Sequence, residues 1–121
     1  MKVRTFTLLF AASLISFGVA AQDFKKTNGM MVNGSGMTLY TFDKDTGGKS
    51  MCNGPCAENW PALMAADDAK PTADMTIVVR DDGKKMWAYK GKPLYTFKKD
   101  TAPGETNGDG FLNGAWHMAK P

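Results

Sequence analysis

GMTLYTFDKDT, residues 36–46, returns as GKPLYTFKKDT at residues 91–101, and most of the positions are identical. Both copies contain Leu-Tyr-Thr-Phe, a run of residues that favour β-strands. Successive side chains of a strand point to opposite faces, so Tyr and Phe share one face while Leu and Thr share the other. When the second copy is allowed one inserted residue, Trp60 falls opposite Trp116. The chain therefore contains two diverged copies of one unit.

Turn signals come before both copies of this strand and predict hairpins. Residues 33–36 (NGSG) follow the apolar run at 30–32, and residues 90–93 (KGKP) follow the run at 86–89. A further run of β-formers and an Asp-Asp-Gly turn precede the second hairpin, which extends it to a three-stranded meander over residues 76–97.

The predicted fold class is all-β, a small antiparallel sheet or sandwich-like domain built from two diverged hairpin-based repeats. Repeat one covers about residues 27–66 and repeat two about residues 75–119. Two copies are fewer than an open solenoid needs, so the repeats are expected to pack their Tyr and Phe faces against one another in a shared core.

One helix is expected in the first repeat, over residues 57–66, where Pro61 limits it to one or two turns. Residues 101–114 are rich in Gly, Asn and Asp and predict a loop. Residues 115–119 predict a last short strand.

The first 21 residues have the pattern of a secretory signal peptide. Lys2 and Arg4 form a positive start, an apolar stretch follows, and residues 19–21 (VAA) are the small residues that a signal peptidase needs. Cleavage there leaves residues 22–121 as a single β domain with no transmembrane segment. No cysteine for lipid attachment lies near the cleavage point, so we expect a soluble protein that is periplasmic or secreted.

The charge pattern excludes nucleic acid as the expected partner. Two of the 15 basic residues and none of the 12 acidic residues lie in the signal, so the mature chain carries a net charge of only +1. Basic and acidic residues are interleaved, whereas nucleic-acid binding needs a basic stripe.

Cys52 and Cys56 are the only cysteines, and in an exported protein such a pair is normally a structural disulfide. Gly-Pro-Cys also ends the thioredoxin motif, which leaves an exchangeable redox pair as an alternative, and a metal site as another. Three residues separate the two cysteines, however, and no βαβ pattern surrounds them.

His117 is the only histidine, and Met118 follows it in a mature chain with eight methionines. Imidazole and thioether ligands suit copper, so these two residues are weak candidates for a copper site. The alternative is that methionine fills gaps in a small core, with no cofactor bound. Asp45 and Asp100 follow the two Tyr-x-Phe strands; they are expected to accept hydrogen bonds from loop amides, and calcium binding is the alternative.

Several motifs together resemble one family. The chain contains CNGPC followed by NWP, the run WAYKGKPLY at 87–95, and a closing GDG before Trp-His. It also carries a paired Tyr-x-Phe-x-x-Asp motif at Tyr40, Phe42 and Asp45 and at Tyr95, Phe97 and Asp100. Nearly the whole of residues 22–121 thereby resembles the bacterial secreted-repeat family, predicted lipoproteins with a Tyr-x-(Phe/Trp/Tyr)-x-x-Asp motif. The resemblance implies an exported protein and no particular activity, and the missing lipid-attachment cysteine departs from the lipoprotein pattern.

No catalytic constellation is present in the sequence, so no enzyme is predicted. The expected function is a non-enzymatic binding or interaction module of the bacterial envelope, whose partner is an envelope protein or a small ligand. One alternative is a periplasmic copper-binding protein using His117 and Met118. Another is a thiol-redox factor using Cys52 and Cys56.

Overall fold

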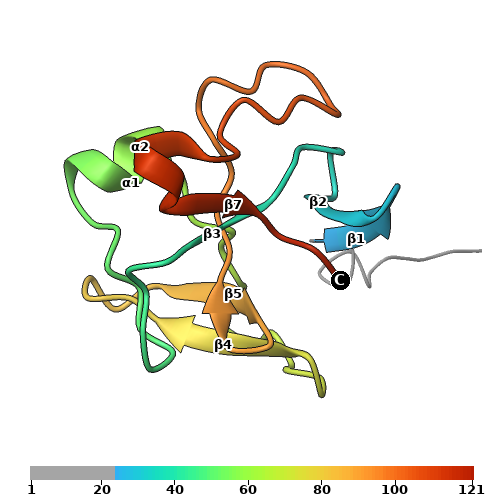
Figure 1. Ribbon diagram of the computed structural model, residues 1–121. Coiled ribbons are helices and arrows are strands. Elements are labelled where there is room, and N and C mark those ends of the chain that lie inside the picture. Colours follow the sequence, from blue (N-terminus) through green and yellow to red (C-terminus); the bar gives the residue numbers. More distant parts are fainter. Residues whose placement is uncertain (1–23) are drawn as a thin grey trace, which may run out of the picture.

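A computed structural model describes residues 24–121, so the predicted signal peptide lies outside the described residues. The chain forms short strands and two short helical turns. In order these are β1 (Phe24–Thr27), β2 (Met30–Asn33), β3 (Tyr40–Phe42), α1 (Pro55–Asn59), β4 (Met75–Val79), β5 (Lys85–Tyr89), β6 (Lys92–Pro93), α2 (Phe111–Gly114) and β7 (Trp116–Met118). The strands pair antiparallel in three small sheets, β1–β2, β3–β7 and β4–β5–β6 (Figure 1). The predicted all-β fold class is confirmed.

The second predicted hairpin forms, whereas the first is only partial, because β2 and β3 lie in different sheets and only an isolated bridge, Val32 with Thr38, joins the two sides of the turn. Strands β4, β5 and β6 make the three-stranded meander, which ends at Pro93 and not at Phe97. The turn at Lys90–Gly91 has positive φ at both residues, which matches the twist of a hairpin.

The first repeat holds a strand that the sequence analysis missed, β1. Its residues after Phe24 are polar and exposed, so they lack the apolar alternation of a strand, and the Asn28–Gly29 turn forms this hairpin.

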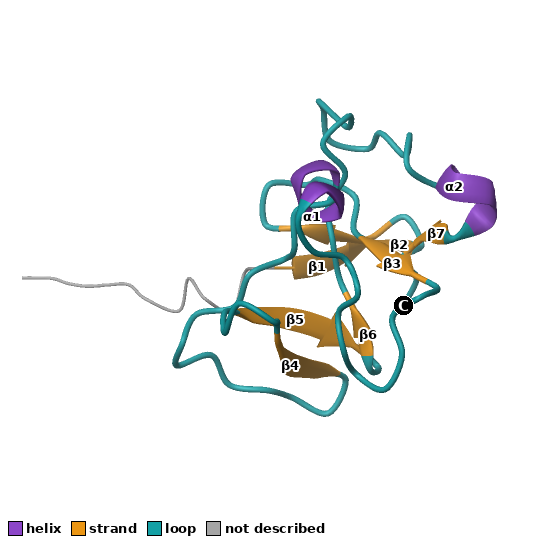
Figure 2. Cartoon of the chain, turned by 90° about the vertical axis from the view of Figure 1, so that its left-hand side faces the viewer, coloured by secondary structure: helices purple, strands orange, loops and turns teal. Residues whose placement is uncertain are grey.

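The two repeats interleave in the middle of the molecule (Figures 1 and 2). Strand β3 of repeat one pairs with β7 of repeat two, with Thr41 opposite His117. In the same way, the second Tyr-x-Phe strand pairs with the segment after Trp60, where Thr96 N donates to Pro61 O at 2.8 Å. These two strand pairings are therefore equivalent when the repeats are interchanged.

The two motif strands also meet each other at the centre of this exchange. Tyr40 N donates to Tyr95 O at 2.7 Å, and Tyr95 N donates to Tyr40 O at 3.0 Å. Tyr and Phe of both strands belong to one aromatic core cluster, whereas Leu39 and Leu94 belong to a second cluster. The alternation predicted from the sequence thus holds, and each strand contributes to both clusters.

The helical turns differ from the prediction over residues 57–66. Helix α1 has Pro55 at its start and stops at Asn59. Trp60 is extended because it precedes Pro61, and the residues that follow lie beside other strands, with Ala62 opposite Tyr95.

Helix α2 lies in the region predicted as loop. It is a tight turn rather than a regular helix, since Leu112 and Asn113 both have left-handed backbone angles. The predicted last strand is confirmed as β7. Within residues 24–121 no helix is both long and apolar enough to cross a membrane.

Candidate functional site

The tyrosines and aspartates of the repeated motif bond across the two repeats. Tyr40 Oη donates to Asp100 Oδ2 at 2.6 Å, and Tyr95 Oη donates to Asp45 Oδ2 at 2.6 Å. Each tyrosine therefore uses the aspartate of the other repeat. Both tyrosines are wholly buried and Asp100 is nearly so, which places the Tyr40–Asp100 bond in the core, whereas Asp45 is half-buried.

The second oxygen of each aspartate accepts a loop amide. Met51 N donates to Asp45 Oδ1 at 2.7 Å, and Asn107 N donates to Asp100 Oδ1 at 3.0 Å. Each aspartate thus fixes the loop that follows its own strand and the tyrosine of the other repeat at once.

The electrostatics of these pairs do not favour proton transfer near neutral pH. Burial, and then the hydrogen bond to a carboxylate, raise the pKa of both Tyr40 and Tyr95 well above the ordinary value of 10.0. Burial also raises the pKa of Asp45, although the bonds from Tyr95 and Met51 act in the opposite direction. The hydroxyls therefore stay protonated, which suits a structural tie between the repeats.

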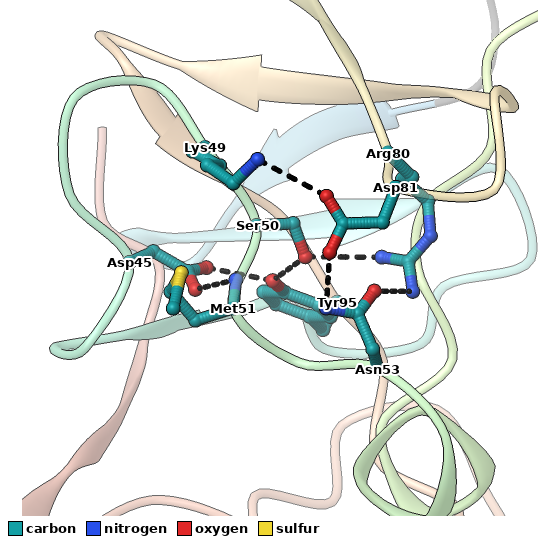
Figure 3. A network of polar contacts seen from close by, with 8 residues as sticks. All are labelled: Asp45, Lys49, Ser50, Met51, Asn53, Arg80, Asp81 and Tyr95. Carbon is teal, nitrogen blue, oxygen red and sulfur yellow. Dashed lines mark hydrogen bonds and ion pairs between the residues drawn. The ribbon is translucent and has the colours of Figure 1, made fainter.

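The pair in the first loop belongs to a larger polar network (Figure 3). Ser50 Oγ lies 2.6 Å from Tyr95 Oη and accepts a bond of 3.0 Å from Arg80 Nη1. Arg80 is buried, and its Nη2 donates to Cys52 O at 2.8 Å. The sequence analysis did not single out Ser50 or Arg80, which are isolated residues outside the repeated motif. In the second repeat Gly108 N occupies the place of Ser50, donating to Tyr40 Oη at 3.2 Å.

The predicted disulfide is present between Cys52 and Cys56. It joins the loop held by Arg80 to the first turn of α1, and the Cys52 side chain is fully buried. Both thiols are used in this bridge, so the first loop is held by a covalent bond as well as by the polar network.

The other motif aromatics form one continuous stack. Trp60 and Trp116 lie parallel with ring centroids 3.7 Å apart. Phe42 stacks on Trp116 at 4.2 Å, and Phe97 stacks on Trp60 at 4.1 Å. Each phenylalanine stacks on the tryptophan of the other repeat. The stacking contacts therefore join the two repeats in the same way as the tyrosine–aspartate hydrogen bonds do. All four rings are buried, which places them in the core and not at a binding surface.

The structure separates His117 from Met118. His117 Nε2 lies 2.8 Å from Asp43 Oδ2 on the exposed face of β7, whereas Met118 is half-buried against the aromatic core cluster. Asp43 and Asp45, two residues apart, also have different partners, His117 and Tyr95. No group of three histidine, cysteine, aspartate or glutamate side chains within residues 24–121 is arranged to hold a metal ion.

A groove of about 580 Å³ opens beside β7. Residues from β3, β5, β6 and the end of the chain line it, including Asp43, Tyr89, Lys90, Lys92, His117 and Lys120. The sequence does not predict this groove, because its residues are scattered along the chain and are brought together by the pairing of β3 with β7. The histidine was its one signal in the sequence.

A family model described as a secreted repeat of unknown function matches residues 24–64 and 76–120. The chain belongs to this family. The two matched segments are the two repeats whose tyrosines bond to the aspartates of the other repeat. They confirm the resemblance drawn from the motifs. No curated protein and no solved structure matches the chain significantly. An exported protein of unknown activity fits the secreted-repeat family.

Proposed function

We propose that this secreted-repeat protein is a non-enzymatic binding module of the bacterial envelope, periplasmic or secreted, and that its ligand occupies the groove beside β7. One observation carries the proposal: the polar groups of the repeated motif are bonded to one another and to loop amides, whereas the charged groups of the groove are exposed. The motif residues therefore have a structural role, and the exposed groups of the groove are available to bind a ligand.

The comparison of the two repeats supports a special role for this face. Asp43 N donates to Ala115 O, and Lys98 N donates to Asn59 O, so Asp43 and Lys98 hold equivalent places. By the same equivalence Pro61 stands where His117 stands in the other half. The histidine–aspartate pair therefore occurs in only one of the two equivalent strand pairings. The other pairing forms with Pro61 and Lys98 at these positions, so the fold does not require the histidine and the aspartate.

The groove also has the size and chemistry of a binding site. Its volume is within the range of small-molecule pockets, and it combines hydrogen-bond donors and acceptors around a tyrosine ring. Thr41 stands opposite His117 in the groove, but within residues 24–121 no hydrogen bond joins the Thr41 hydroxyl to the His117–Asp43 pair, so these side chains support binding better than turnover.

Amide chemical shifts can detect binding in the groove even while the ligand is unidentified. The mature ¹⁵N-labelled chain is mixed with a low-molecular-weight extract of the bacterial envelope, and the shifted amides are mapped. Amides of Thr41, His117 and Lys92 should move. A Thr41→Trp variant should fill the groove and remove the response, whereas Thr96→Trp, the equivalent change on the other side, should keep it. Shifts confined to another face, or chemical conversion of the recovered ligand, would overturn the proposal.

The two rival functions give different results with the same sample. A copper protein would show tight Cu(I) binding that His117→Ala abolishes. A thiol-redox factor would exchange electrons with a dithiol substrate and lose activity in a Cys52→Ser/Cys56→Ser variant. If either result is obtained and no ligand binds in the groove, the proposal of a binding module is wrong and the corresponding rival function replaces it.

A further inference from the structure

We infer that the groove beside β7 binds a small hydroxylated organic anion, a sugar acid or a sugar phosphate, through the hydroxyl of Tyr89 and the lysines around it. The inference rests on the proposed function of the groove and adds the chemical class of the ligand.

Tyr89 supplies the first argument. It ends β5, lines the groove and is only 7% exposed. A buried phenol normally has a hydrogen-bond partner, because an unpaired buried polar group costs free energy. Within residues 24–121 the Tyr89 hydroxyl has none, in contrast to Tyr40 and Tyr95. A ligand oxygen in the groove would supply this missing partner.

The lysines supply the second argument. Lys90 lines the groove, and its Nζ lies 5.3 Å from the centroid of the Tyr89 ring. Lys92 and Lys120 line the same groove. Across the described part of the chain, none of these three ammonium groups has a carboxylate partner. Several unpaired cations around one hollow favour an anionic ligand, since charge-assisted hydrogen bonds are the stronger ones.

The carboxylates of the groove explain why the ligand should also carry hydroxyl groups. Asp43 is bonded to His117, and Asp109 Oδ1 accepts the amide of Met118 at 3.0 Å. Both are exposed and retain free lone pairs that accept hydrogen bonds from hydroxyls. A ligand with several anionic groups would be repelled by these aspartates, whereas a hydroxylated ring with one anionic group matches both kinds of lining residue.

Titration with three related sugars tests the inference. The probes are D-glucuronate, D-glucose 6-phosphate and neutral D-glucose, added to the mature chain up to about 10 mM, which is ten times a Kd of about 1 mM. At least one of the two anions should shift the amides of Tyr89, Lys92 and His117, with a Kd of about 1 mM or below. Glucose should bind about tenfold more weakly, and added salt should weaken the anion.

Variants then locate the binding. Tyr89→Phe removes only the hydroxyl and keeps the ring, and Lys92→Ala removes one ammonium group. Tyr89→Phe should weaken the anion about tenfold, because it removes a buried hydrogen bond to a charged group. Lys92→Ala should weaken it about two- to fivefold, the effect expected of one exposed charged contact. Lys84→Ala, at the exposed β4–β5 turn, is the matched control and should leave the Kd unchanged.

The failure of this inference differs from the failure of the proposed function. Equal binding of glucose and the anions, or binding of neither anion while the envelope extract still shifts the groove amides, overturns the anionic class and leaves the binding module in place. The inference is also overturned if Tyr89→Phe and Lys92→Ala leave the Kd of the anion unchanged. The same holds if the control Lys84→Ala weakens binding as much as these two variants do. Loss of all groove shifts, including those from the extract, overturns both.

Discussion

The hydroxyl of Tyr40 lies 2.6 Å from the carboxylate of Asp100, sixty residues further along the chain. Its counterpart joins Tyr95 Oη to Asp45 Oδ2, fifty residues earlier in the chain, at the same distance of 2.6 Å. Because each tyrosine uses the aspartate of the other repeat, neither repeat can satisfy its own motif alone. The Tyr-x-Phe-x-x-Asp motif is therefore a device that joins two repeats into one cooperative domain.

Removal of either tyrosine hydroxyl should destabilise the domain. Tyr40→Phe leaves an oxygen of the buried Asp100 carboxylate without its donor, which costs about 1–3 kcal/mol in the free energy of unfolding. Tyr95→Phe does the same to the half-buried Asp45 and should cost about 1 kcal/mol, near the low end of that range. Tyr89→Phe is the control, since its hydroxyl has no partner within residues 24–121, and it should cost close to nothing. Urea unfolding at neutral pH measures all three. Equal stability of Tyr40→Phe and wild type would contradict the structural role of the exchange.

Alkaline pH should unfold the protein through the same tyrosines. Their folded-state pKa is raised above the unfolded value of 10.0 by burial and by the bonded aspartates. The stability they contribute is therefore fully present below pH 10 and is lost as the pH rises above that value toward the folded pKa. Tyrosinate absorbance and circular dichroism, followed in one titration, check this. Tyr40 and Tyr95 should ionise only together with unfolding.

The outcome that would contradict this prediction is full tyrosinate absorbance from all three tyrosines while the circular dichroism remains native. The double variant Tyr40→Phe/Tyr95→Phe serves as the control. It lacks both buried hydroxyls, so its loss of stability above pH 10 should be shallower than that of the wild type.

The disulfide should contribute stability and no activity. Cys52 and Cys56 close a loop of five residues, for which the chain-entropy model gives about 2 kcal/mol. Cys52→Ser/Cys56→Ser should lower the free energy of unfolding by about this amount, because Arg80 and Asp45 still hold the loop by hydrogen bonds. Urea unfolding measures the loss. An unchanged amide map of the groove in the same variant would separate stability from function, and an altered map would contradict a purely structural bridge.

The sequence could predict the strands but not their partners. Alternation in the two motif strands correctly placed Tyr and Phe on one face and Leu on the other. The same pattern in both copies could not decide whether Tyr40 bonds to Asp45 or to Asp100, because the two aspartates are equivalent in sequence. The helix predicted within 57–66 exists as one short turn, but its bounds were wrong: it begins at Pro55 and ends at Asn59, because Trp60 is extended before Pro61.

The groove could not be predicted either, since it exists only after β3 and β7 pair. Lys90 and Lys120 are thirty residues apart, and single lysines in a chain of mixed charge give no signal. His117 was the one groove residue singled out in the sequence, as a weak candidate ligand of copper and not as part of a groove. Its observed partner is Asp43.

Gly108 gives the sharpest test of the aromatic stack. A Cβ atom at this position would lie 2.7 Å from Trp60 Cη2 and 2.8 Å from Cζ3. Trp60 cannot retreat, because its ring is held between Trp116 and Phe97. Gly108→Ala should therefore lower the free energy of unfolding by about 1–3 kcal/mol, the usual cost of overpacking.

A second substitution shows whether the contact with Trp60 causes this loss. Trp60→Phe removes the two ring atoms that the new methyl group would meet, so Gly108→Ala should cost about 1 kcal/mol less in that background. Urea unfolding of the wild type, the two single variants and the double variant completes the cycle. If Gly108→Ala costs the same in both backgrounds, the loss comes from the loop backbone around Gly108, and the stack does not limit this position.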